Sequence, residues 1–345
     1  MKKGDYMRIT IKDIASSLGI SYTTVSRALN NHPEISEATK EKVRNTARDL
    51  GYMRNEMARG LVKSNSQTIG VLIQDITNPY FANIVRGIED YCQEMRFATF
   101  LGNSDWNPEK EKDYIRWFLS KQVDGLLINP VNVKTRDMLC SLNLSIPVVL
   151  AATIDVTNTY PCVGVDNEGL THMVTEYLIN LQHKDIVFLG GNENITGIIP
   201  RITGYSKVME KNHLEKKILT SSVGLTRESG RIEGLKLLEM RPLPTAVITA
   251  NDNIALGLME VLGEKGITVP DDISIISSDN IDIASLHQIS LTTVDQPKYE
   301  LGVLAAKILI NRILNIPDDY PQQNVLPFSL KERNSTRRNI KSNDM

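Results

Sequence analysis

Hydrophobic and polar positions divide the chain into two parts with different periodicities. Between Thr10 and Gly51, apolar residues recur three or four positions apart, which is the spacing of amphipathic helices. Gly19 interrupts this pattern, and Ser21 and Ser36 stand where helix N-caps are expected. The pattern predicts three short helices in a helix-turn-helix arrangement. Their predicted inward residues are Ile11, Ile14, Ala15, Leu18, Val25, Ala28, Leu29, Ala38, Val43, Ala47 and Leu50.

From residue 68 onward, short apolar runs alternate with amphipathic stretches such as residues 84–95 and 170–181. The runs have the length of buried strands and are bounded by turn-forming residues. Strands that alternate with helices predict parallel sheets with helices on both faces, so the expected fold class is α/β. So many strands exceed one sheet, and two lobes are expected. The predicted strands are residues 68–73, 98–101, 125–128, 147–150, 163–165, 186–189, 218–221, 246–249 and 274–276.

These patterns predict four regions: residues 7–53 as a helix-turn-helix domain, 54–66 as a hinge helix with a linker, 67–327 as a two-lobed body, and 328–345 as a tail. Lobe 1 is expected to comprise residues 67–165 and 294–325, and lobe 2 residues 166–292. The expected crossovers between the lobes lie near residues 163–167, 291–296 and 321–326. The hinge is too short to be stable alone, and Gly60 costs it a further ~1 kcal/mol.

The second predicted helix, within the segment SYTTVSRALN, carries more hydrogen-bonding groups than a core helix needs. In a helix-turn-helix module this helix enters the DNA major groove, where its polar face contacts base edges and phosphates. Arg27 can donate two hydrogen bonds to guanine, and Tyr22 and Thr23 are placed to contact bases. The side chains suited to phosphate oxygens are Ser21, Thr24 and Ser26. A small helical module that binds protein is the alternative.

The charge distribution agrees with a nucleic-acid partner. Residues 1–63 contain 12 Lys and Arg against 7 Asp and Glu, whereas the whole chain has a net charge of −2. The remainder is therefore acidic. A basic head on an acidic body is typical of a polyanion-binding module joined to a globular one, although a small basic domain is weak evidence alone.

Composition and motifs argue against several other classes of protein. Cys92, Cys140 and Cys162 show neither metal-ligand spacing nor disulfide density, which suits a reducing cytoplasm. No run approaches the length of a membrane span, and the N-terminus lacks the apolar segment of a signal peptide. Dinucleotide, phosphate-loop, zinc-protease and serine-hydrolase motifs are absent, and the five histidines are scattered. We therefore expect no catalysis, no cofactor and no metal site.

Polar side chains follow most of the predicted strands. Ligands of open parallel sheets bind beyond the carboxyl ends of the strands, so two facing lobes would line a cleft with these groups. Short amides and carboxylates suit hydroxyl-rich ligands, but Asn and Asp also favour such turns as caps. The strand-end residues are Asp75, Asn103, Asn129, Asn192, Asn251, Asp252, Asp279 and Asn280.

The segment TIKDIASSLGISYTTVSRALNNHPEISEATKEKVRNTARDLGYMRNEMARGL resembles the DNA-binding head of the LacI/GalR family of bacterial transcription regulators. The resemblance implies base reading by Tyr22, Thr23 and Arg27. It also implies that hinge helices pair across a dimer and that Leu61 enters the minor groove. A plain linker contact is the alternative for Leu61. The predicted DNA-binding residues are Ser21, Tyr22, Thr23, Thr24, Ser26, Arg27, Asn30, Arg59 and Leu61.

The segments IGVLIQDITNPYFANIVRGIEDY, RITGYSKVM and TAVITANDNIALGLMEVLGEKGITVPDDISIISSDN resemble the effector domain of the same family, which shares its fold with periplasmic sugar-binding proteins. The resemblance implies that Tyr80, Phe81, Arg201, Asn251 and Asp279 face the effector. Aromatic rings would pack on an apolar ligand face, and the guanidinium and carboxylate would pair with polar groups. With Asp75 from the strand ends, these six are the predicted effector-binding residues.

The chain departs from the family pattern at three places near the expected cleft. SSDN at residues 277–280 stands where GFDD is usual, and Leu225 stands where many members have an aromatic residue. The usual acid is missing from residues 151–153, which are similar to the catabolite-control branch. Each change alters the shape or polarity of the pocket, so the identity of the effector does not follow from the resemblance.

The expected function is that of a transcriptional repressor in the cytoplasm. Its affinity for double-stranded operator DNA would be controlled by a small-molecule effector, a sugar or sugar derivative, bound between the lobes. One reading helix covers only a few base pairs, so a homodimer is expected, with contacts within residues 81–95 and 285–290. The alternatives are a cytoplasmic sugar-binding protein without DNA activity and a catabolite-control-type regulator that uses a protein co-effector.

Overall fold

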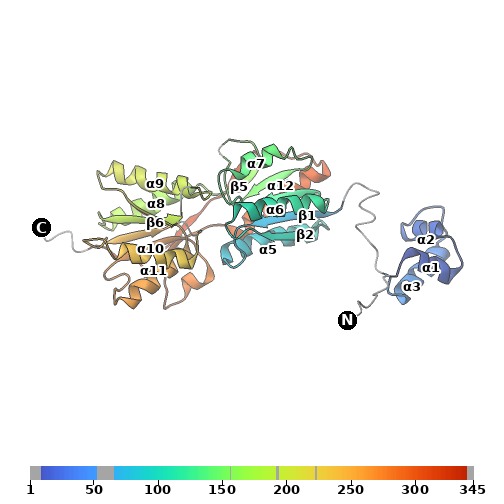
Figure 1. Cartoon of the computed structure of the whole chain (residues 1–345), viewed down its shortest axis with the longest axis horizontal. Helices are drawn as coiled ribbons and strands as arrows, with labels where there is room; N and C mark the ends of the chain where they lie inside the picture. Colours follow the sequence, from blue (N-terminus) through green and yellow to red (C-terminus); the bar gives the residue numbers. More distant parts are fainter. Residues whose placement is uncertain (1–8, 53–65, 156, 192–193, 222–223, 340–345) are drawn as a thin grey trace. The chain divides into compact units, whose positions relative to one another are not determined.

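The computed structural model describes residues 9–52, 66–155, 157–191, 194–221 and 224–339 (Figure 1). The chain forms two compact units: the head, Met1–Ser66, and the body, Gln67–Met345. The hinge positions Arg59 and Leu61 lie outside the described residues.

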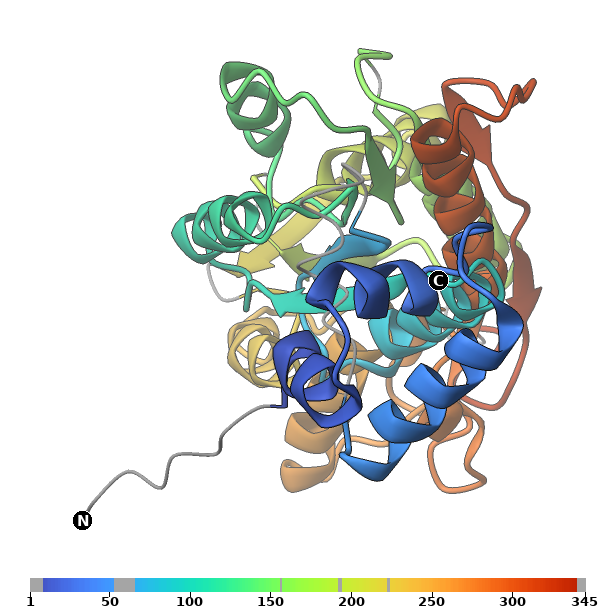
Figure 2. The same ribbon diagram turned by 90° about the vertical axis from the view of Figure 1, so that its right-hand side faces the viewer.

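The described residues of the head form three helices, α1 (Ile11–Leu18), α2 (Tyr22–Leu29) and α3 (Glu37–Asp49), drawn in blue in Figure 2. Their start and end signals act as predicted. The hydroxyl of Ser21 accepts from the backbone N of Thr24 at 3.0 Å, and that of Ser36 accepts from Thr39 at 3.3 Å. Gly19 ends α1 with a φ of 66°, a left-handed conformation that glycine adopts without strain.

A small apolar core holds the three helices together, and each helix contacts the other two. Its buried residues are Ile14, Ala15, Val25, Ala28, Val43 and Ala47. The prediction is wrong for Ala38 and Leu50, which are exposed. Lys40 lies on the buried face of α3 instead, 6% exposed, and its Nζ donates to Glu37 at 2.7 Å. A lysine can occupy this position because its aliphatic stem packs while its ammonium reaches the surface.

The body contains two six-stranded sheets, one in each lobe. The first has the order β11-β5-β4-β3-β1-β2 and is parallel throughout. The second has the order β12-β10-β9-β8-β6-β7, and only β12 is antiparallel to its neighbour. The strands of sheet 1 are β1 (Thr68–Ile73), β2 (Ala98–Asn103), β3 (Gly125–Ile128), β4 (Val148–Ala151), β5 (Cys162–Gly164) and β11 (Gln323–Val325). Those of sheet 2 are β6 (Ile186–Gly191), β7 (Lys217–Ser221), β8 (Ala246–Thr249), β9 (Ser274–Asp279), β10 (Thr292–Asp295) and β12 (Ser329–Lys331).

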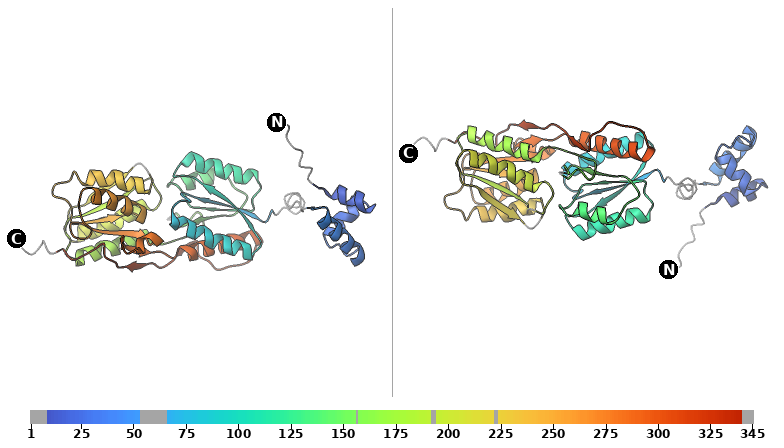
Figure 3. Two further views of the ribbon diagram at one scale, coloured as in Figure 1. Left: turned by 90° about the horizontal axis from the view of Figure 1, so that it is seen from below. Right: turned by 90° about the horizontal axis from the view of Figure 1, so that it is seen from above.

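Helices cover both faces of each sheet, which confirms the predicted α/β fold class (Figure 3). Around sheet 1 they are α5 (Pro79–Glu94), α6 (Pro108–Ser120), α7 (Thr135–Ser141) and α12 (Lys298–Leu314). Around sheet 2 they are α8 (Asn167–Asn180), α9 (Ile198–Lys211), α10 (Arg227–Leu237) and α11 (Asp252–Glu264), with a short 3-10 helix at Asp282–Ser285. Successive side chains of β1 point to opposite faces of sheet 1. Val71 packs with α5 and α12 on one face, whereas Leu72 packs with α6 on the other.

Three chain segments connect the lobes. They follow β5, β10 and β11, and lie at residues 164–167, 295–298 and 325–329. The third differs from the expected position, because β11 itself occupies residues 323–325 as the edge strand of sheet 1.

The C-terminal segment corrects the prediction that residues 328–345 are a tail. Residues 329–331 form β12, which pairs with β10, and the segment then continues along lobe 2. Ser335 is 2% exposed, its hydroxyl donates to the carbonyl of Ile275 at 2.6 Å, and it accepts from the N of Thr292 at 2.8 Å. The segment is polar, and its polar groups form hydrogen bonds with backbone groups of sheet 2. Composition alone does not reveal this role, so the segment was predicted to be a tail. Within the described residues, no helix has the length and apolar character needed to cross a membrane.

Candidate functional site

The outward face of α2 is polar and exposed, as its sequence predicts. Tyr22 is 60% exposed, and Thr23 and Arg27 are also exposed. Ser21 serves as the N-cap, and the Nδ2 of Asn30 donates to the carbonyl of Ser26 at 2.9 Å. The other two predicted contacts on this helix, Thr24 and Ser26, are half-buried. The helix therefore presents base-reading groups near its start and an arginine one and a half turns further on.

Arg27 is paired within the head. Its Nη1 donates to Oε2 of Glu34 at 3.0 Å, and the two side chains are 51% and 67% exposed. His32 lies 3.7 Å from the same carboxylate. An exposed pair of this kind is weak, so the guanidinium can exchange Glu34 for the acceptors of a base.

A cavity lies between the two lobes of the body, where the empty space, open solvent included, amounts to about 550 Å³. Its walls come from the segments that follow the carboxyl ends of strands in both sheets, where parallel sheets bind ligands. Five of the six predicted effector residues line it: Tyr80, Phe81, Arg201, Asn251 and Asp279. The remaining lining residues are Gln74, Asn78, Trp106, Asn129, Ala152, Val165, Asn167, Thr196, Gly197, Ile198, Leu225 and Gln296.

Asp75 is absent from the cavity lining. Its Oδ1 accepts from the backbone N of Thr77 at 2.9 Å and from the Thr77 hydroxyl at 2.6 Å. The carboxylate therefore closes the turn before α5, which is the local capping role that Asp often takes after a strand.

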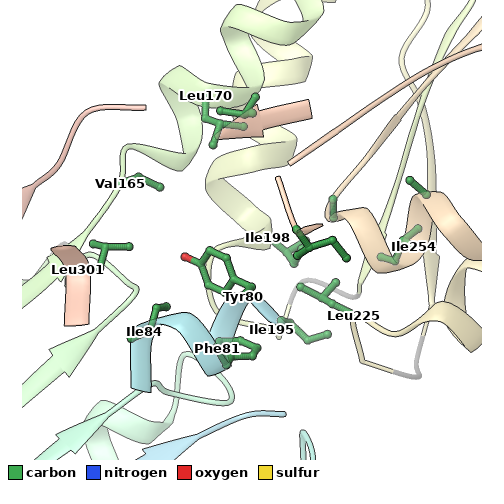
Figure 4. Packing of buried hydrophobic residues seen from close by; sticks show 14 of the residues in the cluster. Tyr80, Phe81, Ile84, Val165, Leu170, Ile195, Ile198, Leu225, Ile254 and Leu301 are labelled. Atoms are coloured by element: carbon green, nitrogen blue, oxygen red, sulfur yellow. The ribbon is translucent and has the colours of Figure 1, made fainter. Parts of the chain in front are cut away.

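Aromatic and aliphatic side chains from both lobes form the apolar walls of the cavity. Tyr80 and Phe81, at the start of α5, lie opposite Ile198 and Leu225 of lobe 2 (Figure 4). The Tyr80 and Phe81 rings are 5.2 Å apart at 84°, and Phe81 meets Trp106 at 6.2 Å and 66°. These edge-to-face contacts fix the rings in place. These walls offer an apolar surface to a ligand.

A buried polar network crosses from lobe 1 to the chain segment after β10. The hydroxyl of Tyr80 donates to Oε1 of Gln296 at 3.1 Å, and Nε2 of Gln296 donates to Oδ1 of Asp279 at 3.0 Å. Lys298 Nζ donates to the carbonyl of Asp279 at 2.6 Å. Asp279 has a φ of 125°, which is strained for a residue other than glycine. Such strain is held by surrounding structure and is common at functional sites.

Asp279 shares its buried site with a second carboxylate. Burial, reinforced by the neighbouring Asp252, raises the pKa of Asp279 well above its usual range, against the opposing effect of Arg201 and Lys298. Burial also raises the pKa of Asp252, which accepts from the Thr293 hydroxyl at 2.6 Å and from the N of Ile281 at 2.9 Å. Two buried carboxylates in one site resist double ionisation. A protonated Asp279 can donate as well as accept hydrogen bonds.

Arg201 and Asn251 already have protein partners at the cavity. Arg201 Nε donates to Oδ1 of Asn167 at 2.9 Å, and its Nη1 donates to the carbonyl of Ala250. Asn251 caps α11 by accepting from the N of Ile254 at 3.0 Å, and it donates to the carbonyl of Leu225 at 3.0 Å. The guanidinium is thus oriented by lobe 2, and the Asn251 side chain serves mainly as a cap.

Three buried polar atoms at the cavity have no hydrogen-bond partner among the described residues. They are Nε1 of Trp106, Oδ1 of Asn129 and the hydroxyl of Thr196. The first two belong to lobe 1 and the third to lobe 2. An unsatisfied buried polar atom costs about 1–3 kcal/mol, so native proteins keep few of them without a reason. A donor, an acceptor and a hydroxyl on residues that line one cavity indicate a polar ligand.

The lobes touch at two places besides the network of Tyr80, Gln296 and Asp279. Asn132 and Ile195 form an isolated antiparallel bridge, and the N of Val133 donates to the carbonyl of Asn194 at 3.3 Å. The lobe 1 side of this bridge is held by buried Glu111, whose carboxylate accepts from the N of Val131 at 2.8 Å and from the Thr135 hydroxyl at 2.6 Å. At the second place, the side chain of Trp106 from lobe 1 packs against the backbone of Gly224 from lobe 2. The two lobes are therefore in direct contact in this structure.

Sequence reasoning missed Trp106, Asn167, Thr196 and Gln296. Trp106 had a usable signal, since an aromatic residue stands alone in the polar segment NSDWNP. Gln296 follows directly after the unpredicted strand β10. In the parts of the chain that the structure describes, no three His, Cys, Asp or Glu side chains are grouped to hold a metal ion.

Comparison with known proteins covers both units. Residues 10–55 match bacterial regulatory proteins of the lacI family, and residues 175–336 match a periplasmic binding protein-like domain. Catabolite control protein A of Priestia megaterium is 36% identical over 306 residues, which cover 88% of this chain and 92% of the relative. The transcriptional repressor PurR of Vibrio atlanticus (strain LGP32) is 35% identical over 309 residues, covering 88% and 92%.

Solved structures agree with these relatives. The lac repressor dimer bound to operator and the anti-inducer ONPF has a TM-score of 0.81 at 26% identity, covering 96% of this chain and 99% of that chain. The transcription regulator CcpA of Lactococcus lactis has a TM-score of 0.71 at 32% identity, covering 78% and 99%.

A helix-turn-helix head followed by a two-lobed ligand-binding body defines a class of protein: DNA-binding transcription regulators that respond to small-molecule effectors. The chain belongs to the LacI family of bacterial regulatory proteins. The predictions of family, fold class and regulatory function are confirmed.

Proposed function

We propose that this regulator is a homodimeric repressor whose operator affinity is controlled by a neutral monosaccharide bound between the lobes. The observation that carries the effector assignment is the set of three unsatisfied polar atoms, contributed by both lobes, at the cavity. A sugar hydroxyl both donates and accepts, so it can satisfy an indole N–H, an amide oxygen and a threonine hydroxyl. The aromatic wall then covers an apolar face of the sugar ring.

The charges around the cavity favour a neutral ligand over a phosphorylated one. Among its described lining residues, Arg201 is the one basic side chain and Asp279 the one acidic side chain. A phosphate would find one arginine already bonded to Asn167 and a carboxyl group facing it. A neutral sugar is also consistent with a LacI-family regulator from Enterococcus faecium that was solved with bound ribose, at 28% identity and a TM-score of 0.69 over 79% of this chain and 99% of that chain.

DNA recognition is assigned to the exposed face of α2. Tyr22, Thr23 and Arg27 would read bases, and Ser21, Thr24, Ser26 and Asn30 would contact the backbone. We extend the proposal to Arg59 and Leu61 in the hinge. One α2 covers only a few base pairs, so two copies are required for a full operator. The apolar residue Leu286, 52% exposed, supports a dimer contact at residues 285–290, and nearby Ile283 is 42% exposed.

The proposed site of action is the bacterial cytoplasm, because the protein binds DNA. The proposed action is binding alone, without catalysis. The effector controls the operator by favouring one arrangement of the lobes, and it shifts that equilibrium only by its differential affinity for the two arrangements. Coupling of about 1–3 kcal/mol, or roughly 5- to 150-fold in operator affinity, is typical. Sugar that relieves repression is the proposed direction.

Substitution of Arg201 tests this proposal. Arg201→Ala removes the cation that lines the cavity but leaves α2 intact, so it should bind operator as the wild type does and lose the response to sugar. Operator would be selected from random-sequence DNA with the wild-type protein. The sugar would be whichever of D-ribose, D-glucose, D-galactose and D-fructose raises the melting temperature of the wild type, since binding stabilises the folded state.

The readout is fluorescence anisotropy of labelled operator with and without that sugar. Lys207→Ala is the matched control, because Lys207 lies on the same helix and makes only an exposed pair with Glu168. A normal sugar response by Arg201→Ala would contradict the proposal. So would a wild-type melting temperature that none of the four sugars changes.

A further inference from the structure

Trp106 lies in a short polar loop between β2 and α6, at an energetically unusual backbone conformation. Its φ is 59°, in the left-handed region that residues other than Gly, Asn and Asp rarely adopt. The loop is held by several contacts. Ser104 donates to the carbonyl of Ile73 at 3.0 Å, and Asn107 caps α6 by accepting from the N of Glu109 at 2.9 Å. A tryptophan kept in such a conformation indicates a constraint beyond packing.

The indole lies at the cleft between the lobes. It lines the cavity and packs edge-on against Phe81, and its Nε1 is buried without a partner among the described residues. It also crosses to lobe 2. A Cβ added to Gly224 would lie 2.8 Å from Cγ of Trp106, so only the absence of a side chain at position 224 gives the ring its place.

Lobe 2 supplies no aromatic ring to the described lining of the cavity. Leu225 lines the cavity on the lobe 2 side, and the three aromatic lining residues, Tyr80, Phe81 and Trp106, all belong to lobe 1. Trp106 approaches the same place from lobe 1, over Gly224. The aromatic surface of this cleft is therefore supplied by the opposite lobe, together with a hydrogen-bond donor that a phenylalanine would lack.

We infer that Trp106 is a specificity-determining residue of the effector site: its ring covers the sugar, and its Nε1 donates to a sugar hydroxyl as the lobes close. This inference rests on the proposed monosaccharide effector. Because the ring touches both lobes, its environment reports closure as well as binding.

The chain contains two tryptophans, Trp106 and Trp117, which makes the inference directly measurable. Trp117 is 43% exposed on α6 and packs against Phe100 and Phe118, away from the cavity residues. In a Trp117→Phe protein, Trp106 is the sole indole emitter. Titration of this full-length variant with D-ribose, D-glucose, D-galactose and D-fructose should give a saturable change in emission with the sugar that raises the melting temperature.

Two substitutions at position 106 separate the ring from its N–H group. Trp106→Phe retains an aromatic ring and should bind the sugar several-fold more weakly, whereas Trp106→Ala should bind it about tenfold more weakly or worse. Trp117→Phe is the matched control and should bind as the wild type does. Affinity is measured by calorimetry on protein whose folded state is verified by circular dichroism, so that a loss of stability is not mistaken for a loss of binding.

The outcomes distinguish the inference from the proposed function. If a sugar stabilises the wild type but Trp106→Ala binds it with unchanged affinity, Trp106 has only a packing role and the inference fails while the effector proposal stands. Unchanged Trp106 emission at saturating sugar has the same meaning. If none of the four sugars stabilises the wild type, the effector proposal fails, and the role of Trp106 fails with it.

Discussion

Arg27 shows how a base-reading side chain is held before it meets DNA. In the free head it pairs with Glu34, and both side chains are more than half exposed. Such a pair is worth at most about 1 kcal/mol, whereas a bidentate contact to guanine discriminates by about 1–3 kcal/mol. Glu34 therefore competes with DNA for the guanidinium, at low cost to recognition.

This competition predicts opposite effects for the two partners. Arg27→Ala should weaken operator binding by ~1–3 kcal/mol and relax the preference at one base pair of each half-site. Glu34→Gln should strengthen binding several-fold, because it frees Arg27 and removes a negative charge near the DNA. The measurement is affinity for the selected operator and for its single-base variants at fixed salt.

Glu41→Gln controls for the charge alone, since Glu41 is an exposed carboxylate on α3. Equal effects of Glu34→Gln and Glu41→Gln would show that the ion pair with Arg27 is irrelevant to DNA binding.

At the same scale, the sequence identified most of the charged and aromatic residues at the cavity but not how each is used. Asp279 follows a buried strand run, and such strand ends meet at one edge of a parallel sheet. Asp75 also follows a buried strand, yet its carboxylate accepts two hydrogen bonds from Thr77, two residues further along the chain. The choice between a local cap and the cavity depends on the path of the turn, which periodicity does not encode. Trp106 was missed for the same reason.

At the scale of elements, the nine predicted strands all have counterparts, because each predicted run is largely apolar. The three strands that were missed are short and polar. β10 contains two threonines and an aspartate, and β11 and β12 have three residues each. Their places are fixed by hydrogen bonds to strands far away in sequence, such as Val294 opposite Leu330. Hydrophobic periodicity carries no information on such pairings.

His183 anchors the C-terminal segment to lobe 2. Its Nε2 lies 2.9 Å from the carbonyl of Arg337, and its Nδ1 lies 3.0 Å from the hydroxyl of Thr245. A carbonyl only accepts, so Nε2 carries the proton and the neutral ring leaves Nδ1 as an acceptor. Burial lowers the pKa of His183 below its ordinary value of 6.5.

This shift predicts a pH-dependent stability. The unfolded chain takes up a proton at His183 near pH 6.5, whereas the folded protein does so only at lower pH. The contribution of His183 is thus fully present above pH 6.5 and is lost as the pH falls toward the folded pKa, by at most about 1.4 kcal/mol for each pH unit. His183→Gln removes this titration, so the stability difference between wild type and variant should shrink between pH 7.5 and pH 5.5.

Urea unfolding at several pH values measures that difference. His213→Asn is the control, because His213 is exposed and has a positive φ that Asn tolerates. A stability difference between wild type and His183→Gln that is constant over this pH range would contradict the assignment.

At the scale of the whole molecule, the C-terminal segment determines where the folded body ends. A chain that stops at residue 327 loses β12 and Ser335, and leaves the N of Ile275 and the N of Thr292 without their partners at 2.7 Å and 2.8 Å. Each lost partner costs about 1–3 kcal/mol, out of a total stability of roughly 5–15 kcal/mol. We expect the body of this truncated chain to melt at least 10 °C lower or not to fold.

A chain that stops at residue 339 is the control, because it keeps β12, Ser335 and the contacts of Arg337. Calorimetry should show it melting within a few degrees of the full chain. Equal melting temperatures for the two truncated chains would mean that β12 adds nothing to the body.

The order of strands along the chain also determines when each unit can complete its folding during synthesis. Both sheets receive an edge strand from residues 323–331, although the first strand of the body begins at Thr68. A growing chain that has passed β10 still lacks α12 and β11 for lobe 1 and β12 for lobe 2. The head, by contrast, has a core made only of its own helices and is complete long before. We therefore expect premature termination to yield a folded head attached to an incomplete body, so that regulated binding requires translation through the last strands.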